Sequence, residues 1–359
     1  MRDIAPIYRR DALKLLGAGA VASLAGTLLP SSLASAVTPA AALPPGLITR
    51  RIPSSAELLP AIGLGTFLTF DVIAGEQREF VRQVLQASWE KGVRVIDTSP
   101  LYGTGEVSVG DYATALGIGE QIFIANKIWS TGDFLADESH ALASLKQSES
   151  RLWRKRIDLM QCHSLVNVEV IAPYLNAWKK EGLIRYTGVT HYLNDYLQAL
   201  QGWVEKGGLD FVQVQYSIFN RAAEQRVLPA AADKGVAVLT NMPFEKARLF
   251  KLVEGQEVPA FAREAGIRSW SHYFLKWVIS HPAVTCALPA TSNPEHAREN
   301  ALAMYGELPD KALRERMVRH IEGLPGFGEL ARMAPYPGKR YPGVIARAQG
   351  ALRTRLSDG

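Results

Sequence analysis

The sequence has little cysteine, no long hydrophobic run and no strong excess of either charge. Its two cysteines in 359 residues exclude a disulfide scaffold and a zinc finger built on cysteine ligands. No stretch of roughly 18 apolar residues runs without a charged or turn-forming residue, which excludes a multi-span membrane protein. Because 47% of the residues are hydrophobic and only 21% are charged, intrinsic disorder is excluded as the main state.

The net charge of +5 is concentrated at one end of the chain. The last 28 residues carry six basic side chains and one acidic side chain, which accounts for the whole excess. The rest of the chain is balanced, so the sequence offers no basic face for nucleic acid. We therefore expect a monomer whose substrate is a small molecule.

The first 36 residues have the three parts of a bacterial export signal. Arg9 and Arg10 lie in the charged beginning, a weakly apolar stretch covers residues 15–29, and Ala34-Ser35-Ala36 has the small-residue pattern of a cleavage site. The paired arginines resemble a twin-arginine signal, which exports folded proteins. We expect recognition by the twin-arginine translocase, cleavage near Ala36 and a periplasmic location. The alternative is a retained anchor, although the apolar stretch is shorter than the roughly 20 residues that span a bilayer.

Eight short apolar or β-branched runs recur in the remaining chain, with segments of helical periodicity between them. We interpret residues 1–36 as the signal, 37–57 as a linker and N-terminal approach, and 58–305 as a barrel of eight parallel strands alternating with helices. This is the (β/α)8 TIM-barrel class of α/β fold. The predicted strands cover residues 61–67, 93–99, 122–128, 158–164, 186–192, 211–217, 236–242 and 285–290.

A doubly wound open sheet is the structural alternative. It would need a glycine-rich G-x-G-x-x-G turn after its first strand, whereas the residues there are Gly63-Leu64-Gly65-Thr66. Beyond the eighth strand we expect helices around 294–304 and 310–321. The rest of 306–359 is rich in proline, glycine and basic residues and is predicted to be an irregular tail on the surface.

Four side chains with useful chemistry stand at the ends of three consecutive predicted strands. Asp97 and the nearby loop residue Tyr102 follow the second strand, Lys127 the third and His163 the fourth. Singly, each has an ordinary explanation such as a helix cap, loop packing or a core histidine, but TIM-barrel active sites lie at this rim. A buried lysine needs a partner, so we expect a Lys127–Asp97 ion pair. We also expect the lysine to lower the pKa of Tyr102, and His163 to orient a substrate oxygen.

The chain resembles the aldo-keto reductase family over roughly residues 58–305. The resemblance implies a barrel that binds NAD(P)H without a Rossmann motif. It also implies that Tyr102 is the general acid and that Lys127 tunes it. Asp97 would hold the lysine, and His163 would polarise the carbonyl. The matching segments are residues 63–67, 95–103, 125–129, 161–163, 288–292 and 299–300.

The resemblance also implies a set of cofactor-binding residues, with two departures from the family pattern. Asn241 stands where many members stack a tyrosine under the nicotinamide. Ala290 and His296 stand where a lysine and an arginine would meet the 2′-phosphate of NADPH. NADP and NAD both stay open, with NADP favoured by the resemblance. The implied cofactor-binding residues are Thr66, Asp97, Thr190, His191, Gln213, Asn241, Pro243, Phe244, Thr291, Ser292, His296 and Asn300.

These features predict a periplasmic NAD(P)-dependent oxidoreductase that interconverts a carbonyl and an alcohol without a metal. The alternatives are a non-catalytic barrel that senses the nucleotide, and an unrelated barrel lyase or isomerase. Residues 129–137 and the tail after Gly306 are expected to shape the substrate pocket. Because export removes the enzyme from the cytoplasmic nucleotide pool, we expect a loop after the seventh or eighth strand to retain the nucleotide. Cys162 and Cys286 fall on opposite walls of the barrel and should stay unbridged.

Overall fold

The barrel and the segments around it are seen in a computed structural model, which describes residues 43–73, 75, 77–129 and 138–357. The expected export signal, residues 37–42 of the expected linker and the loop at 130–137 lie outside the described residues. All described residues belong to one unit of the chain. Within them, no helix is both long enough and apolar enough to cross a membrane.

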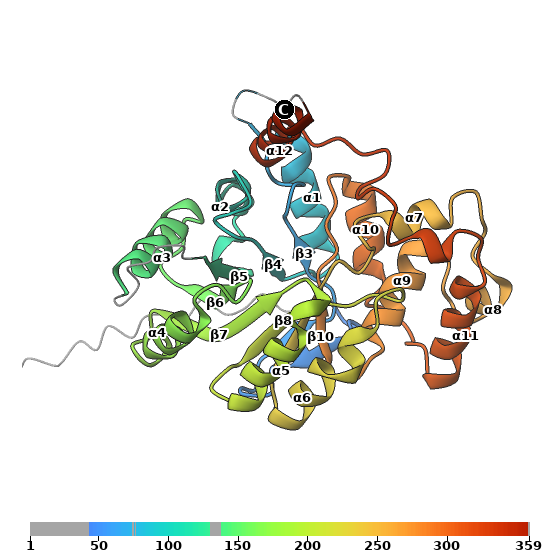
Figure 1. The fold of residues 1–359 in the computed structure, drawn as a ribbon, viewed down its shortest axis with the longest axis horizontal. Helices are drawn as coiled ribbons and strands as arrows, with labels where there is room; N and C mark the ends of the chain where they lie inside the picture. The colour runs from blue at the N-terminus through green and yellow to red at the C-terminus, as the bar shows by residue number, and fades with distance from the viewer. Residues whose placement is uncertain (1–42, 74, 76, 130–137, 358–359) are drawn as a thin grey trace, which may run out of the picture. The chain divides into compact units, whose positions relative to one another are not determined.

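Eight parallel strands run around a barrel in chain order, from β3 to β10 (Figure 1). Bridges from Ile62 to Ala287 and from Gly65 to Ala290 join the first strand region to the last. The predicted (β/α)8 class is therefore confirmed, and the open doubly wound alternative is wrong. The strands are β3 (Leu64–Gly65), β4 (Val95–Asp97), β5 (Phe123–Ile128), β6 (Ile157–His163), β7 (Ile184–His191), β8 (Phe211–Gln215), β9 (Ala237–Asn241) and β10 (Val284–Ala287).

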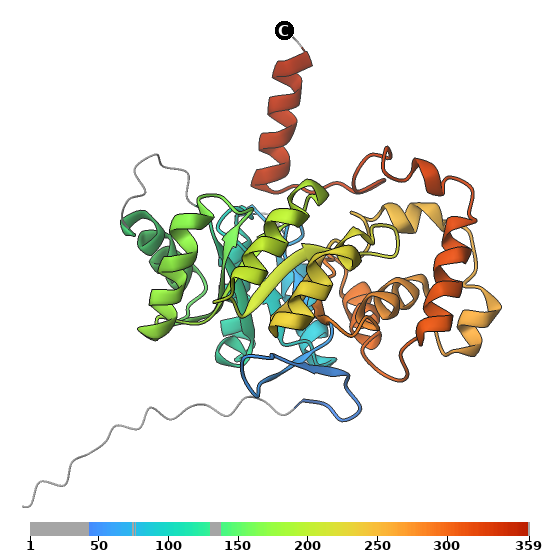
Figure 2. The same ribbon diagram turned by 60° about the horizontal axis from the view of Figure 1, so that its bottom comes forward.

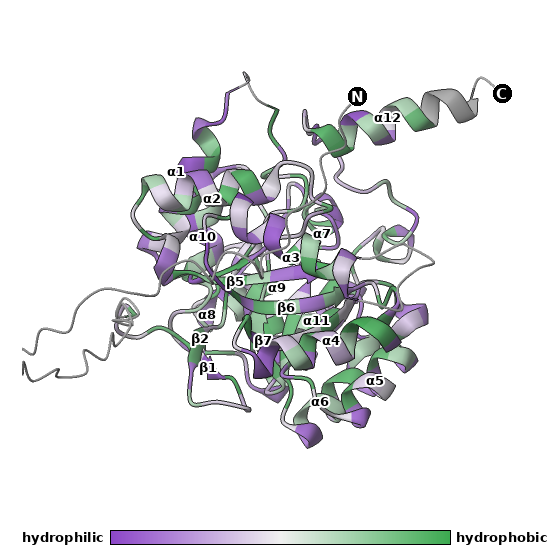
Figure 3. Cartoon of the chain, turned by 90° about the vertical axis from the view of Figure 1, so that its left-hand side faces the viewer, coloured by the Kyte–Doolittle hydropathy of each residue, from purple (hydrophilic) through white to green (hydrophobic). Residues whose placement is uncertain are grey.

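Helices surround the barrel and bury one face against the strands. In Figure 3, helices α4, α5 and α6 carry both hydrophobic and hydrophilic residues, and their buried residues include Leu175, Leu200 and Leu228. The helices are α1 (Glu79–Glu90), α2 (Gly105–Ala115), α3 (Ser139–Arg151), α4 (Val168–Lys180), α5 (Leu197–Lys206), α6 (Val227–Lys234), α7 (Arg248–Leu252), α8 (Ala260–Glu264), α9 (Trp270–Ile279), α10 (Pro294–Leu302), α11 (Lys311–Glu322) and α12 (Val344–Ser357).

Strand side chains alternate between the barrel interior and the layer under the helices, because successive residues of a strand point to opposite faces. In β5, Phe123 and Ala125 belong to the interior cluster, while Ile124 and Ile128 pack in the outer one. Lys127 continues the interior row at the carboxyl end of the strand and is 1% exposed. The interior is therefore apolar at the amino end and becomes polar at the carboxyl end.

An antiparallel hairpin of β1 (Thr49–Arg51) and β2 (Leu58–Pro60) precedes the barrel. Its first strand lies in the part of residues 37–57 that we interpret as the N-terminal approach to the barrel. Ile52 and Leu59 are buried in the interior cluster, and burying such a side chain stabilises the fold by about 1.5–3 kcal/mol. Figure 2 shows the blue hairpin at one end of the barrel and α12 at the other.

The C-terminal region is more ordered than predicted. Helix α11 confirms the helix expected around 310–321, and Asp310 caps it by accepting a hydrogen bond from the Leu313 amide. The tail prediction is wrong beyond residue 343, where α12 forms. This segment contains alanine, leucine, glutamine and arginine, which favour helix.

The two cysteines are free and buried, as expected. Cys162 packs in the layer under the helices, whereas Cys286 faces the barrel interior. Burial raises the pKa of the Cys162 thiol to about 12 and also raises that of Cys286. Both thiols are therefore protonated at neutral pH.

Candidate active site

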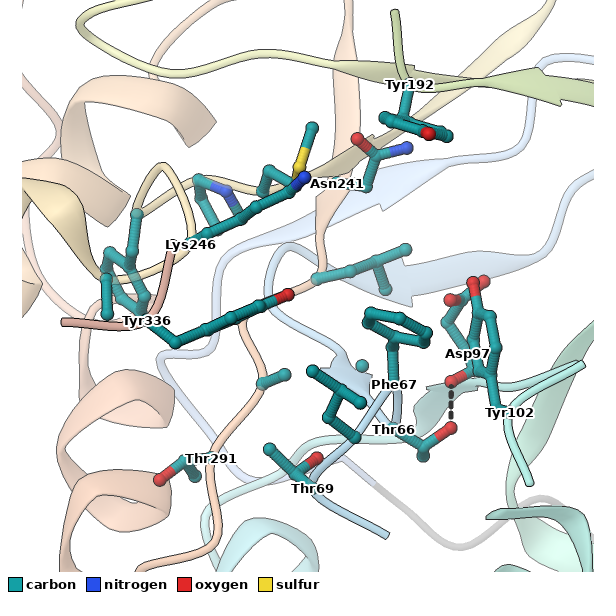
Figure 4. A pocket seen from close by; sticks show the side chains of 18 of the residues that line it. Thr66, Phe67, Thr69, Asp97, Tyr102, Tyr192, Asn241, Lys246, Thr291 and Tyr336 are labelled. Carbon is teal, nitrogen blue, oxygen red and sulfur yellow. Dashed lines mark hydrogen bonds between the residues drawn. The ribbon is translucent and has the colours of Figure 1, made fainter. Parts of the chain in front are cut away.

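A cavity of about 1020 Å³ opens at the carboxyl ends of the barrel strands. Strands β3 to β9 each contribute to its lining, and Leu288 enters it just after β10. This volume is at the upper end of the range typical of small-molecule sites, about 300–1,000 Å³. Figure 4 shows part of the cavity, with Thr66, Asp97 and Tyr102 on one side and Asn241 and Lys246 on another.

The predicted ion pair is present at the rim. Lys127 Nζ lies 2.6 Å from Asp97 Oδ1 and donates a second hydrogen bond to the Thr98 carbonyl oxygen at 2.8 Å. Strand pairing brings the two strands together, because Asp97 is opposite Ala125 in β5, two residues before Lys127. Burial lowers the pKa of Lys127, while the nearby carboxylate opposes that shift. Burial likewise raises the pKa of Asp97 against the attraction of the lysine.

A chain of buried amides continues from this ion pair. Gln213 Nε2 donates to Asp97 Oδ1 at 3.2 Å, and Gln161 Nε2 donates to Gln213 Oε1 at 3.2 Å. Gln161 Oε1 is buried without a hydrogen-bond partner in the part of the chain that the structure describes. Gln213 lines the cavity, as expected of a cofactor residue. It also holds Asp97 in place, a second role that the sequence did not suggest.

Tyr102 sits between the lysine, an aromatic neighbour and the histidine. Its ring centroid is 4.9 Å from Lys127 Nζ, 5.0 Å from the Phe67 ring and 6.0 Å from the His163 ring. The expected lowering of its pKa is wrong, because burial, with smaller contributions from Asp97 and a second tyrosine, raises the pKa well above the usual value. The lysine lies over the ring face. Tyr102 is thus a protonated phenol at neutral pH.

His163 is held as a neutral imidazole. Its Nδ1 lies 3.2 Å from Ser99 Oγ, which also accepts a hydrogen bond from the Leu101 amide at 3.2 Å. Burial, followed by the charge of Lys127, lowers the pKa of His163 to about 3. A Ser99 hydroxyl that donates to Nδ1 leaves Nε2 as the protonated ring nitrogen. Sequence reasoning did not identify Ser99, although it lies in the loop segment that carried the family resemblance.

The structure brings most of the implied cofactor residues into this one cavity. Thr66 Oγ1 donates to the Asp97 carbonyl oxygen at 2.9 Å (Figure 4), and His191 stacks on Tyr196 with ring centroids 3.8 Å apart. Ser292 is exposed and does not line the cavity, because it lies in the turn before Asn293 caps α10. The cavity-lining members are Thr66, Asp97, Thr190, His191, Gln213, Asn241, Pro243, Phe244, Thr291, His296 and Asn300.

The loop between β9 and α7 is unusual in its backbone. Met242, Glu245, Lys246 and Ala247 all have positive φ, between 51° and 67°. Non-glycine residues seldom adopt this conformation, and such strain gathers at functional sites. Lys246 lines the cavity, which makes it a cationic site residue that sequence reasoning missed.

Phe244 lines the cavity, and its ring also packs among other aromatic rings. It is 8% exposed, and its ring packs against Phe250 at 4.7 Å and Phe274 at 6.4 Å. Asn241 also lines the cavity, and its Oδ1 is buried without a partner among the described residues.

The hydrogen-bonding groups and the positive charges of the cavity suit a nicotinamide dinucleotide. Hydroxyl and amide side chains of Thr190, Gln213, Thr291 and Asn300 can bond the polar groups of such a molecule, and the orphaned Asn241 Oδ1 can accept one. Lys246 and Lys339 place two cations on the walls for phosphate groups. Arg298, a nearby cation on α10, pairs with Glu295 and is not among the residues that line the cavity.

The C-terminal tail supplies part of the cavity wall, in agreement with the expectation that the chain after Gly306 shapes the pocket. Trp129, the first residue of the other expected loop, is 37% exposed and is not part of the lining. Sequence reasoning did not identify individual tail residues, because no local pattern shows which part of a tail folds back. The lining residues from the tail are Pro335, Tyr336, Lys339, Tyr341, Ile345 and Gln349.

Known proteins share both the sequence pattern and the fold. The family model for the aldo/keto reductase family matches residues 61–316. The methylglyoxal reductase YeaE of Escherichia coli is 29% identical over 266 residues, covering 71% of this chain and 89% of that protein. The NADH-specific methylglyoxal reductase of Escherichia coli is 26% identical, covering 64% and 85%. An aldo/keto reductase from Klebsiella pneumoniae, solved with NADP and acetate, superposes with a TM-score of 0.62 at 25% identity, covering 74% of this chain and 93% of that one.

Proposed function

The chain belongs to the aldo/keto reductase family, and we propose that Tyr102 is its proton donor and acceptor in the exchange of hydride between a nicotinamide nucleotide and a small carbonyl compound or alcohol. The observation that carries this proposal is the convergence of Tyr102, His163 and the Lys127–Asp97 pair on one cavity. An unrelated barrel lyase or isomerase is set aside by the family membership.

Protonation states divide the work between two residues. Tyr102, with its raised pKa, carries the proton that the reduced carbonyl oxygen must receive. His163, neutral because burial lowers its pKa to about 3, donates a hydrogen bond from Nε2 and orients the same oxygen. No residue needs to change charge before a carbonyl compound binds.

The ion pair and its neighbours keep this arrangement in place. Lys127 presents its ammonium to the Tyr102 ring at 4.9 Å, where it favours the negative charge that develops on the phenol as the proton leaves. Asp97 fixes the lysine, and Gln213 fixes Asp97. Ser99 fixes the His163 ring.

A nicotinamide nucleotide, when bound, supplies the hydride that the carbonyl carbon accepts. Thr190, His191 and Asn241 would hold its nicotinamide half, while Thr291 and Lys246 would meet its phosphates. Ala290 and His296 line the cavity without providing the lysine and arginine typical of a 2′-phosphate site. We therefore propose either NADP or NAD as cofactor, and the ratio of the dissociation constants of NADPH and NADH decides between them.

The substrate is proposed to be a small carbonyl compound. Two of the relatives are named as methylglyoxal reductases, so methylglyoxal heads a panel of aldehydes and ketones for assay. Turnover of at least one member of the panel supports the enzyme, whereas nucleotide binding without turnover supports the alternative of a non-catalytic sensory barrel.

Export completes the proposal. Arg9 and Arg10, the apolar stretch after them and Ala34-Ser35-Ala36 support a twin-arginine signal cleaved near Ala36. The protein would fold in the cytoplasm. The twin-arginine translocase would then recognise it and release it into the periplasm as a monomer. An enzyme that leaves the cytoplasmic nucleotide pool benefits from taking its nucleotide with it.

A further inference from the structure

A segment of the C-terminal tail, residues 333–349, is called the strap here; it leads into α12 and includes its first turns (Figures 1 and 2). It connects the helical region around α11 with α12. Six of its residues line the cavity, as described above. The strap is therefore part of the site, although it lies beyond the residues matched by the family model, which end at 316.

The strap is attached at one end to the loop between β9 and α7. The Tyr336 amide donates to the Lys246 carbonyl oxygen at 2.8 Å. The Lys339 amide donates to the Tyr336 carbonyl oxygen at 3.0 Å, which closes a turn. Tyr341 packs edge-on against the Tyr336 ring at 5.4 Å. Tyr336 itself has a φ of 56°, so this turn holds an uncommon backbone conformation.

The other end of the strap is attached to Asp71, which is 1% exposed. One carboxylate oxygen accepts a hydrogen bond from the Ile345 amide at 2.8 Å, and the other accepts one from the Thr104 amide at 3.1 Å. Thr104 and Ile345 stand at the beginnings of α2 and α12, where a carboxylate is favoured by unpaired amides and the helix dipole. A Cβ added to Gly343 would overlap the Asp71 backbone carbonyl oxygen. The strap thus approaches Asp71 as closely as only glycine allows.

The strap places the Tyr336 side chain inside the cavity. Figure 4 shows it crossing the cavity below Lys246, with its hydroxyl directed toward the side that holds Asp97 and Tyr102. Tyr336, Lys246 and Thr291 all line the same cavity. The ring therefore lies across a cavity whose walls, at Lys246 and Thr291, are those that the nucleotide would use.

We propose that Tyr336 gates the nucleotide site: the strap, anchored at Asp71, holds Tyr336 across the cavity, so that nucleotide enters or leaves only when Tyr336 moves aside. This inference rests on the proposed nucleotide-dependent function. The strap slows both entry and exit, since both require Tyr336 to move aside. Slow exit is the property that an exported enzyme needs to keep its nucleotide.

The experiment compares two matched glycine substitutions in the full chain. Gly343→Ala pushes the strap off Asp71. Gly350→Ala, in α12, serves as the control, because its added Cβ meets no atom of the described residues within 4 Å outside its own helix backbone and chain neighbours. Tyr336→Ala removes the ring and leaves the anchor. We expect Gly343→Ala and Tyr336→Ala each to accelerate both association and dissociation of NADPH or NADH by about tenfold, equivalent to about 1.4 kcal/mol, in stopped-flow fluorescence. Gly350→Ala should match the wild type.

Hydrogen exchange of the nucleotide-free protein gives a second readout. The Tyr336 amide, which bonds to the Lys246 carbonyl oxygen, should exchange faster in Gly343→Ala than in Gly350→Ala. If nucleotide associates with and dissociates from all variants at wild-type rates, the proposed gate is wrong and the proposed function is unaffected. A change confined to one of the two rate constants also overturns the gate, because nucleotide must pass Tyr336 on the way in and on the way out. Absence of nucleotide binding in the wild type overturns the proposed function and the gate together.

Discussion

Lys127 Nζ lies 2.6 Å from Asp97 Oδ1, and the two side chains are only 2% and 7% exposed. Removing one partner of such a pair leaves a buried charge without compensation, which costs about 3–5 kcal/mol. We expect Lys127→Met to lower the free energy of unfolding in urea by about that amount. Lys146→Met is the control, because Lys146 is 55% exposed in its pair with Glu149 and should cost at most about 1 kcal/mol. Equal losses would contradict a special role for the buried pair.

Tyr102→Phe removes the proposed proton donor and keeps the ring. We expect carbonyl reduction to fall by about 10²–10⁴-fold, while the dissociation constant of the nucleotide stays within a few-fold of the wild type. Single-turnover oxidation of NAD(P)H in the presence of the best aldehyde measures the first quantity, and fluorescence titration the second. A variant that keeps more than about a tenth of the wild-type kcat, a loss far below that range, would show that another group donates the proton.

The pH dependence of reduction follows from two shifted pKa values. The raised pKa of Tyr102 keeps its proton in place as the pH rises, and the pKa of His163, lowered to about 3, keeps the imidazole neutral as the pH falls. Reduction needs both of these forms, so we expect kcat/KM to be flat from about pH 5 to about pH 9, with no transition near the ordinary histidine value of about 6.5. Loss of activity below a midpoint near that value would mean that His163 titrates as an ordinary imidazole.

Ser99→Ala tests the positioning of His163. Without the hydroxyl at 3.2 Å from Nδ1, the ring loses the group that fixes its orientation. We expect kcat to fall by about tenfold, or about 1.4 kcal/mol, with nucleotide affinity unchanged. Ser99→Thr retains a hydroxyl and should recover most of the rate. Equal activity of the alanine and threonine variants, both below wild type, would point to packing as the cause.

Replacing Arg9 and Arg10 with lysines tests the export route. Lysine keeps the positive charge but lacks the planar fork of arginine, so a translocase that reads the arginines should reject the variant. We expect the protein to accumulate in the cytoplasm, as measured by fractionation and immunoblotting. Arg50→Lys, a change of the same kind in β1, is the control. Unchanged periplasmic yield of the double variant would favour the route for unfolded chains.

The strands and the reactive residues were predictable because both depend on local pattern. Alternation along a strand fixes which side chains enter the barrel, so Lys127 could be placed beside Asp97 from its position in an apolar run. Parallel strands in sequential order then bring their carboxyl ends to one rim. His163 and Tyr102 were placed by the same reasoning.

What escaped prediction depends on contacts between distant parts of the chain. The Asp71 carboxylate accepts a hydrogen bond from the amide of Ile345, 274 positions later. The hydrophobic periodicity of the sequence cannot predict such a contact. The hairpin of β1 and β2 consists of strands of three residues each, too short for alternation to be read. The direction of the pKa shift of Tyr102 depended on how deeply the side chain is buried. The effect of burial, which raises the pKa, outweighs any effect of the nearby lysine.

Cys162 and Cys286 are both buried with raised pKa values, so this protein has no reactive thiol among the residues described. A thiolate is the reactive form of cysteine, and neither residue supplies one at neutral pH, so maleimides and disulfide-forming oxidants should leave the folded protein untouched. A single cysteine introduced on the exposed face of α12, for example Ala348→Cys, would then carry a fluorophore to one known position. Because neither thiol reacts, the protein has the same covalent structure in a reducing and in an oxidising compartment. Transfer of the folded protein from one compartment to the other therefore requires no bond to form or break.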